Sequence, residues 1–83
     1  MRRRSTRPPT DKGAKGLREW AGLTVRQLAE NYSLEARLPR DLDTSAVRHW
    51  DRGACRPRDM AAYARTIGTT LDVVYRALSG GAR

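Results

Sequence analysis

The sequence predicts an all-α fold of about five short helices, and two observations carry this prediction. In several segments, apolar residues recur at positions i, i+3, i+4 and i+7, the spacing that gathers side chains on one face of an α-helix. No segment alternates apolar and polar residues as a half-buried β-strand does. We therefore expect the 83 residues to form one small helical domain.

The first two predicted helices follow each other closely. Leu17, Trp20 and Ala21 mark a short helix that ends near Gly22. The next helix begins at the capping box Thr24-Val-Arg-Gln27, where a hydroxyl and a carboxamide satisfy backbone N–H groups at the helix start. The apolar stripe of this second helix consists of Val25, Leu28, Ala29 and Tyr32.

Segment 44–53 predicts a third helix with an apolar edge and a basic edge. Asp43 stands where an N-cap is expected, and Gly53 stands where a C-cap is expected. Val47 and Trp50 share one face, which we expect to be buried. A helix this short is not stable alone, so neighbouring helices must hold it. The polar edge carries Arg48, His49 and Arg52.

Two further helices complete the predicted bundle. The fourth begins at Arg58 or Asp59 and ends at Gly68, and the fifth is capped by Thr70 and ends at Ser79. Both tryptophans and all three tyrosines are expected in the core. The apolar stripes are Met60, Tyr63, Ala64 and Ile67 in the fourth helix, and Leu71, Val74, Tyr75 and Leu78 in the fifth.

The net charge of +8 is concentrated in two places. Residues 1–16 hold six cations against one acid, with consecutive prolines and no apolar periodicity, so residues 1–13 are expected to be a flexible basic arm. The folded domain then spans 14–79, and 80–83 is a short disordered tail. Within the domain, segment 44–58 holds four arginines and the single acid Asp51.

Several classes of protein are disfavoured by the composition. The single cysteine, Cys55, excludes an intramolecular disulfide and fits a reducing cytoplasm. We expect its side chain to be half-buried and not to be a reactive thiol. Cys55 and the single histidine, His49, lack the partners that a metal site or a catalytic centre needs. No apolar run is long enough for a membrane span. We therefore expect a protein that is not an enzyme and uses no cofactor, metal or small-molecule ligand.

The order of these motifs resembles the lambda-repressor-like (Cro-type, XRE) helix-turn-helix domain. The resemblance covers about residues 14–79. It includes the junction between the fourth and fifth helices, from Ile67 to Asp72, where the helix end is followed by a glycine, hydroxyl residues and Leu-Asp. It implies double-stranded DNA as the partner, with the second helix across the backbone and the third in the major groove. The matching segments are Leu17–Thr24, Val25–Glu30, Ala46–Gly53 with Arg56-Pro57, Met60–Gly68 and Thr69–Val74.

The resemblance also assigns roles to individual residues. The candidates for base contacts are Thr44, Ser45, Arg48 and His49. The candidates for phosphate contacts at matching positions are Arg26, Gln27, Arg52, Arg56 and Arg58. Arg37 and Arg40 are further candidates, from the segment before Asp43 that the family pattern does not cover. In the basic arm, Arg2, Arg3, Arg4 and Arg7 either reach the minor groove or backbone of DNA or form a non-specific tail. The alternative for Arg48 and Arg52 is a surface ion pair with Asp51 or Glu30.

One segment departs from the family pattern. Between the second and third helices the chain is longer than a compact helix-turn-helix by about eight residues, and the usual turn glycine is absent. Two conformations are open for residues 31–43. The second helix can extend to about Leu38, before Pro39, or the segment can be a long loop whose Arg37 and Arg40 touch the DNA backbone.

The sequence therefore predicts a transcriptional regulator of phage or bacterial type that reads operator DNA with helix 44–53. It is expected in the cytoplasm of a bacterium or phage-infected cell, at the nucleoid. A homodimer through residues 71–78 is a further expectation. Two alternatives stay open: an architectural recombination directionality factor, and an antitoxin-like module that binds a protein.

Overall fold

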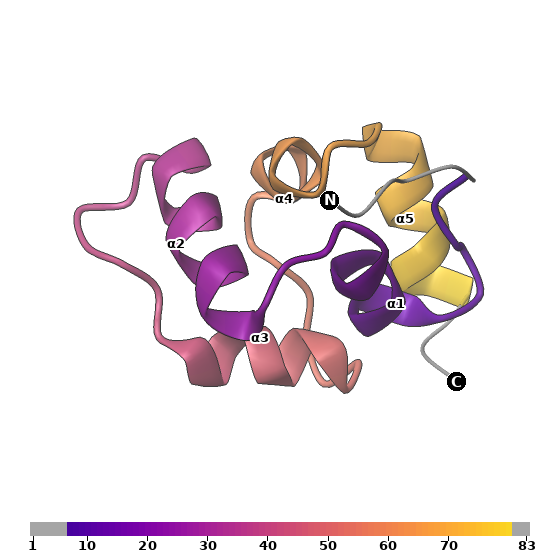
Figure 1. The fold of residues 1–83 in the computed structure, drawn as a ribbon, viewed down its shortest axis with the longest axis horizontal. Helices are drawn as coiled ribbons and strands as arrows, with labels where there is room; N and C mark the ends of the chain where they lie inside the picture. The colour runs from indigo at the N-terminus through magenta and orange to yellow at the C-terminus, as the bar shows by residue number, and fades with distance from the viewer. Residues whose placement is uncertain (1–6, 81–83) are drawn as a thin grey trace.

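The computed structural model describes residues 7–80, and within this range it contains five helices and no strand (Figure 1). The prediction of an all-α bundle of about five short helices is therefore confirmed. Gly80, the first residue of the predicted tail, is the last residue of the final helix, and residues 81–83 of that tail lie outside the described residues. The helices are α1 (Gly13–Trp20), α2 (Val25–Glu35), α3 (Thr44–Asp51), α4 (Met60–Ile67) and α5 (Leu71–Gly80).

The helices pack around one hydrophobic core. Helix α2 packs against α3 and α4, while α1 packs against α3 and α5, and α4 closes the bundle against α5. Helix α3 lies along one edge of the molecule, below α1 and α2 in Figure 1. It is therefore supported from one side only. The largest fully buried side chains are Tyr63, Leu17, Leu28, Ile67, Val47 and Val74.

Three of the predicted helix caps are present. Thr24 Oγ1 accepts a hydrogen bond from the Gln27 N–H, and Gln27 Oε1 accepts one from the Thr24 N–H, which completes the capping box. Asp43 caps α3 by accepting from the Ser45 N–H, and Thr70 Oγ1 accepts from the Val73 N–H at the start of α5. Asp59, predicted only as a possible first residue of the fourth helix, caps α4 by accepting from the Ala62 N–H. The local sequence thus sets where these helices begin.

Helices α2 and α3 both end in a residue with left-handed backbone geometry, but the residue type differs. Helix α3 ends at Asp51, two residues before the predicted end, because Arg52 is its C-cap and Gly53 turns the chain with a φ of 76°. Helix α2 ends with Arg37 at a φ of 56°, so an arginine occupies the left-handed position that usually favours glycine. This explains how the chain turns there without a glycine.

Of the two conformations that the sequence left open for residues 31–43, the structure shows the loop, because α2 ends at Glu35 and does not extend to Leu38. The loop leaves the far end of α2 and runs back beside it to the start of α3 (Figure 1). The buried Ser33 Oγ donates to the Ala29 carbonyl oxygen and accepts from the Leu42 N–H, with both distances 2.7 Å. This hydroxyl fastens the loop to α2 just before α3 begins.

Some predicted core positions are at the surface instead. In α5, Leu71 and Tyr75 are 42% and 45% exposed, because the helix turns Val74, Ala77 and Leu78 toward α1 and α4. Trp20 is half-buried at the edge of the core. Cys55 is exposed rather than half-buried. The apolar stripe of α5 therefore has a second, uncovered edge.

We expect Ser33→Ala to lower the free energy of unfolding by about 1–3 kcal/mol, because it leaves the partly buried Leu42 N–H without its hydrogen-bond partner. Ser45→Ala, on the exposed side of α3, serves as the matched control and should change stability by less than about 0.5 kcal/mol. Urea unfolding followed by circular dichroism measures both values. Equal effects of the two substitutions would contradict the role of Ser33.

Candidate nucleic-acid interface

Helix α3 is held in place by Trp50. The Trp50 ring packs edge-on against Tyr32 of α2, with centroids 5.0 Å apart, and against Tyr63 of α4, with centroids 5.7 Å apart. Both tyrosine hydroxyls are used, because Tyr32 Oη accepts from the Asp59 N–H and Tyr63 Oη donates to the Ala14 carbonyl oxygen. We call Tyr32, Trp50 and Tyr63 the aromatic cluster, and it joins α3 to two other helices.

The residue after Trp50 forms the second anchor of α3. Arg18 Nε donates to Asp51 Oδ2 at 3.0 Å, and Arg18 Nη1 donates to the Leu23 carbonyl oxygen at 2.9 Å. The two side chains are only 13% and 11% exposed. Arg18 thus ties α1 and the turn before α2 to the end of α3. Burial raises the pKa of the Asp51 carboxyl, and the positive charge of Arg18 opposes this shift.

The opposite side of α3 is exposed and polar. Ser45 and Arg52 point away from the core edge formed by Val47 and Trp50, as the helical repeat requires. Arg48 and His49 flank them and are also exposed, whereas Thr44 is half-buried near α2. Three of the four predicted base-contact residues therefore share one exposed face. We call Ser45, Arg48, His49 and Arg52 the α3 face.

Arg52 contacts His49 across one turn, with Arg52 Nη2 3.0 Å from His49 Nδ1. A guanidinium nitrogen can only donate a hydrogen bond, so the Nδ1 atom must accept and the neutral ring carries its proton on Nε2. His49 then presents a donor outward. Arg52, predicted as a phosphate contact, also orients a neighbour on the same face.

The predicted alternative, in which Arg48 or Arg52 pairs with Asp51 or Glu30, is not what the structure shows. Asp51 is paired with Arg18, and Glu30 lies 3.6 Å from Arg26 Nε. Arg48 and Arg52 therefore have no ion pair with an acid among the described residues, and their charges remain available.

Two notches are lined in part by Arg48 of the α3 face. The first, which we call the α2-side notch, carries mixed charge and includes Arg26, Glu30 and Asp43. The second, the α1-side notch, is a small cavity of about 320 Å³. It is lined by Lys15, Arg18, Val25, Arg48, Asp51 and Arg52, so four cations surround one acid. Positive charge thus gathers at the C-terminal half of α3.

Lys15 is absent from the predicted contacts, and Arg18 was not singled out either. Both lie in α1, and the chain brings that helix against α3 only through tertiary packing. The sequence offers one weak signal for Lys15. It follows Ala14, which faces the core of a short amphipathic helix, so Lys15 itself is expected to face outward.

The predicted phosphate contacts are distributed over several elements. Gln27 starts α2, and its carboxamide oxygen is used in the capping box, which leaves the NH₂ group to donate. Arg37 and Arg40 are exposed on the loop, but Arg37 follows the end of α2 that lies opposite α3 (Figure 1). The structure therefore does not bring Arg37 next to the α3 face.

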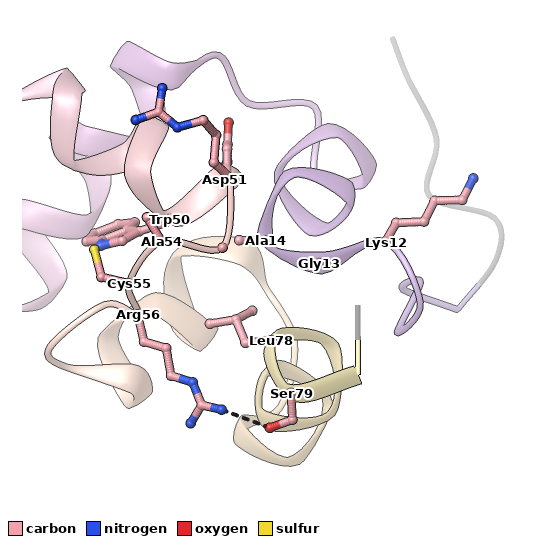
Figure 2. Close-up of a pocket in the computed structure, with 12 residues that line it drawn as sticks. Lys12, Gly13, Ala14, Trp50, Asp51, Ala54, Cys55, Arg56, Leu78 and Ser79 are labelled. Atoms are coloured by element: carbon pink, nitrogen blue, oxygen red, sulfur yellow. Dashed lines mark hydrogen bonds between the residues drawn. The ribbon is translucent and has the colours of Figure 1, made fainter. Parts of the chain in front are cut away.

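The remaining basic residues lie after α3 or before α1. Arg56 Nη2 donates to Ser79 Oγ at 3.1 Å beside a cavity between α1, α3 and α5 (Figure 2). Arg58 lines a different, apolar groove. In the predicted arm, Arg7 is exposed, and α1 begins at Gly13, the last residue assigned to that arm. The other three arm residues, Arg2, Arg3 and Arg4, lie outside the described residues.

No protein-family model, curated protein or solved structure matches this chain. Within residues 7–80, no helix is long and apolar enough to cross a membrane. The same residues contain no group of three or more potential metal ligands. The function of this chain is therefore inferred from the α3 face and its surroundings.

We expect the stability of the protein to depend on the ionisation of Asp51. In the folded protein the pKa of this carboxyl is raised above its ordinary value of 3.8. The folded state therefore favours the protonated form of Asp51, and the stabilisation from this preference is fully present below pH 3.8. The contribution is lost as the pH rises through the folded-state pKa. The free energy of unfolding of the wild type, relative to that of Asp51→Asn, should fall over this interval.

Urea unfolding of both proteins at a series of pH values from about 3 to 7 measures this difference. A wild-type advantage that grows with increasing pH would contradict a raised Asp51 pKa.

Proposed function

We propose that this chain is a sequence-specific double-stranded DNA-binding transcriptional regulator of the lambda-repressor-like helix-turn-helix type. One observation carries the proposal. The aromatic cluster and the Arg18–Asp51 ion pair hold one side of α3, while its other side presents Ser45, Arg48, His49 and Arg52 to solvent. A helix that is anchored along one edge and basic along the other fits the major groove of B-DNA.

The α3 face suits the acceptor-rich edge of guanine. Arg48 can donate two hydrogen bonds to guanine O6 and N7, and the Nε2–H of His49 adds another donor. The Ser45 hydroxyl both donates and accepts, so it tolerates several bases. Arg48 and His49 together favour guanine within the recognised site.

The start of α2 supplies a second contact of a different kind. The capping box fixes Gln27 at the first turn, where backbone N–H groups and the helix dipole favour an anion. The NH₂ group of Gln27 can donate to a phosphate oxygen there. This arrangement matches the bracing role that the resemblance gives to the second helix.

We infer that the protein acts in the cytoplasm of a bacterium or phage-infected cell, at operator DNA, without a cofactor. A homodimer would bind two half-sites about one helical turn apart. The exposed Leu71 and Tyr75 of α5 support this dimer, because large apolar side chains at a surface favour burial against a partner.

A protein-binding module is the second candidate function, and one feature favours it. An apolar groove of about 820 Å³ runs between the loop after α2 and the start of α5. Among the described residues, four large apolar side chains are exposed, and the groove collects three of them, Leu38, Leu71 and Tyr75. A regulator that lacks DNA affinity but captures a partner protein through this groove would fit the second function.

The first prediction of the proposal concerns sequence preference. The full chain, mixed with a library of random DNA duplexes, should enrich a defined motif, and binding should weaken steeply with salt. Arg48→Ala should lose about 1–3 kcal/mol of discrimination at particular base pairs. Arg65→Ala is the matched control, because it removes one exposed arginine from α4, which carries no proposed DNA contact and lies outside the proposed dimer interface.

Sequencing of the bound fraction over successive rounds reads the outcome. Binding that depends on salt but enriches no motif would refute sequence-specific recognition. Several tandem sites within one footprint, in place of a palindrome, would favour the architectural alternative.

The second prediction concerns the dimer. Replacement of Leu71 and Tyr75 by glutamine should shift the protein toward monomer, because it removes apolar surface from the interface. Leu34→Gln is the control, since Leu34 is 76% exposed on α2 and does not line the groove. Sedimentation velocity at matched concentrations measures the mass. A dimer that survives the double substitution would exclude this surface.

A further inference from the structure

The α1-side notch contains a lysine to which no role has been assigned. Lys15 is exposed on α1, and it lines the notch together with Arg48 and Arg52 of the α3 face. Burial raises the pKa of the Asp51 carboxyl, and the positive charge of Lys15, like that of Arg18, opposes this shift, as expected for an ammonium group near the end of α3. The lining of the notch thus places Lys15 beside α3.

The cations of this notch are not neutralised from within the protein. Asp51 is the single acid of the lining, and Arg18 engages its Oδ2 atom. Lys15, Arg48 and Arg52 form no ion pair within 4.0 Å with an acid among residues 7–80. The notch therefore presents several donors that can converge on one anion.

We propose that Lys15 and Arg52 hold one phosphate of the DNA backbone in the α1-side notch. This inference rests on the proposed function, because α3 must lie in the major groove for the notch to meet DNA. Helix α1 packs beside α3 and would then lie outside the groove, next to the strand that borders it. Side chains at that position reach phosphate oxygens rather than base edges.

The placement also explains how α1 contributes to DNA binding. Arg18, from the same helix, fixes the end of α3 through Asp51, and Lys15 lies about one turn earlier in α1. A phosphate bound between Lys15 and Arg52 would therefore be positioned by the same ion pair that positions the α3 face. The base contacts of α3 and this phosphate contact then have fixed positions relative to each other.

The chain allows a direct chemical test, because Lys12 and Lys15 are its only lysines. Lys12 precedes α1, and its side chain extends away from the neighbouring cavity in Figure 2. Both amines are exposed and should react with an amine-selective acylating reagent in the absence of DNA. With a duplex carrying the enriched motif, Lys15 should be protected severalfold and Lys12 should not, as read by mass spectrometry of peptides.

Matched variants give a second measurement. Lys15→Gln should weaken duplex binding roughly five- to tenfold near 0.1 M salt and reduce the slope of log K against log salt by about 1. Lys12→Gln makes the same change in net charge and should leave both quantities close to wild type. Lys15→Arg should restore binding, and the enriched motif should be the same for all variants, because a phosphate contact carries no base preference.

The outcomes separate this inference from the proposed function. If the wild type binds no duplex selectively, the proposed function and the inference fail together. If it binds selectively but Lys15 reacts as freely as in the absence of DNA, or both glutamine variants behave alike, only the inference is overturned. Protection of Lys15 by inorganic phosphate alone, without protection by the duplex, identifies a free-anion site and also overturns it.

Discussion

The packing of Trp50 against Tyr32 and Tyr63 is the interaction on which the rest of the structure depends. Helix α3 has eight residues and is too short to persist alone, so its shape comes from what holds it. The aromatic cluster fixes α3 to α2 and α4, and the adjacent Arg18–Asp51 ion pair fixes it to α1. Both anchors lie at the C-terminal half of the helix, and Ser33 steadies the loop that leads into its first turn.

This one-sided support divides the surface of α3 by chemistry. The aromatic cluster and the carboxylate of Asp51 lie on the inner side of α3. Arg48 and Arg52, which form no ion pair with an acid among the described residues, lie on the outer side. Because Arg18 engages Asp51, the acid that is nearest in sequence to Arg48 and Arg52 does not neutralise them. The ion pair therefore serves the fold and the α3 face at once, and it leaves the positive charge where an anionic partner can meet it.

Local rules predicted much of the fold, and tertiary packing decided the remainder. The caps at Thr24, Asp43 and Thr70 and the burial of Trp50 follow from residue type and spacing. The exposure of Tyr75 does not, because the rotation of α5 is set by its contacts with α1 and α4. The loop after α2 begins at a left-handed arginine, which no turn rule selects. Lys15 was missed because only the packing of α1 brings it to α3.

We propose that the exposed side of α3 is the surface that contacts DNA. An NMR titration of the ¹⁵N-labelled protein with a duplex carrying the enriched motif tests this proposal, because each backbone amide reports its own surroundings. We expect the largest chemical-shift changes at residues 44–52, with smaller changes at the start of α2. Shifts confined to the apolar groove around Leu38, Leu71 and Tyr75 would contradict it.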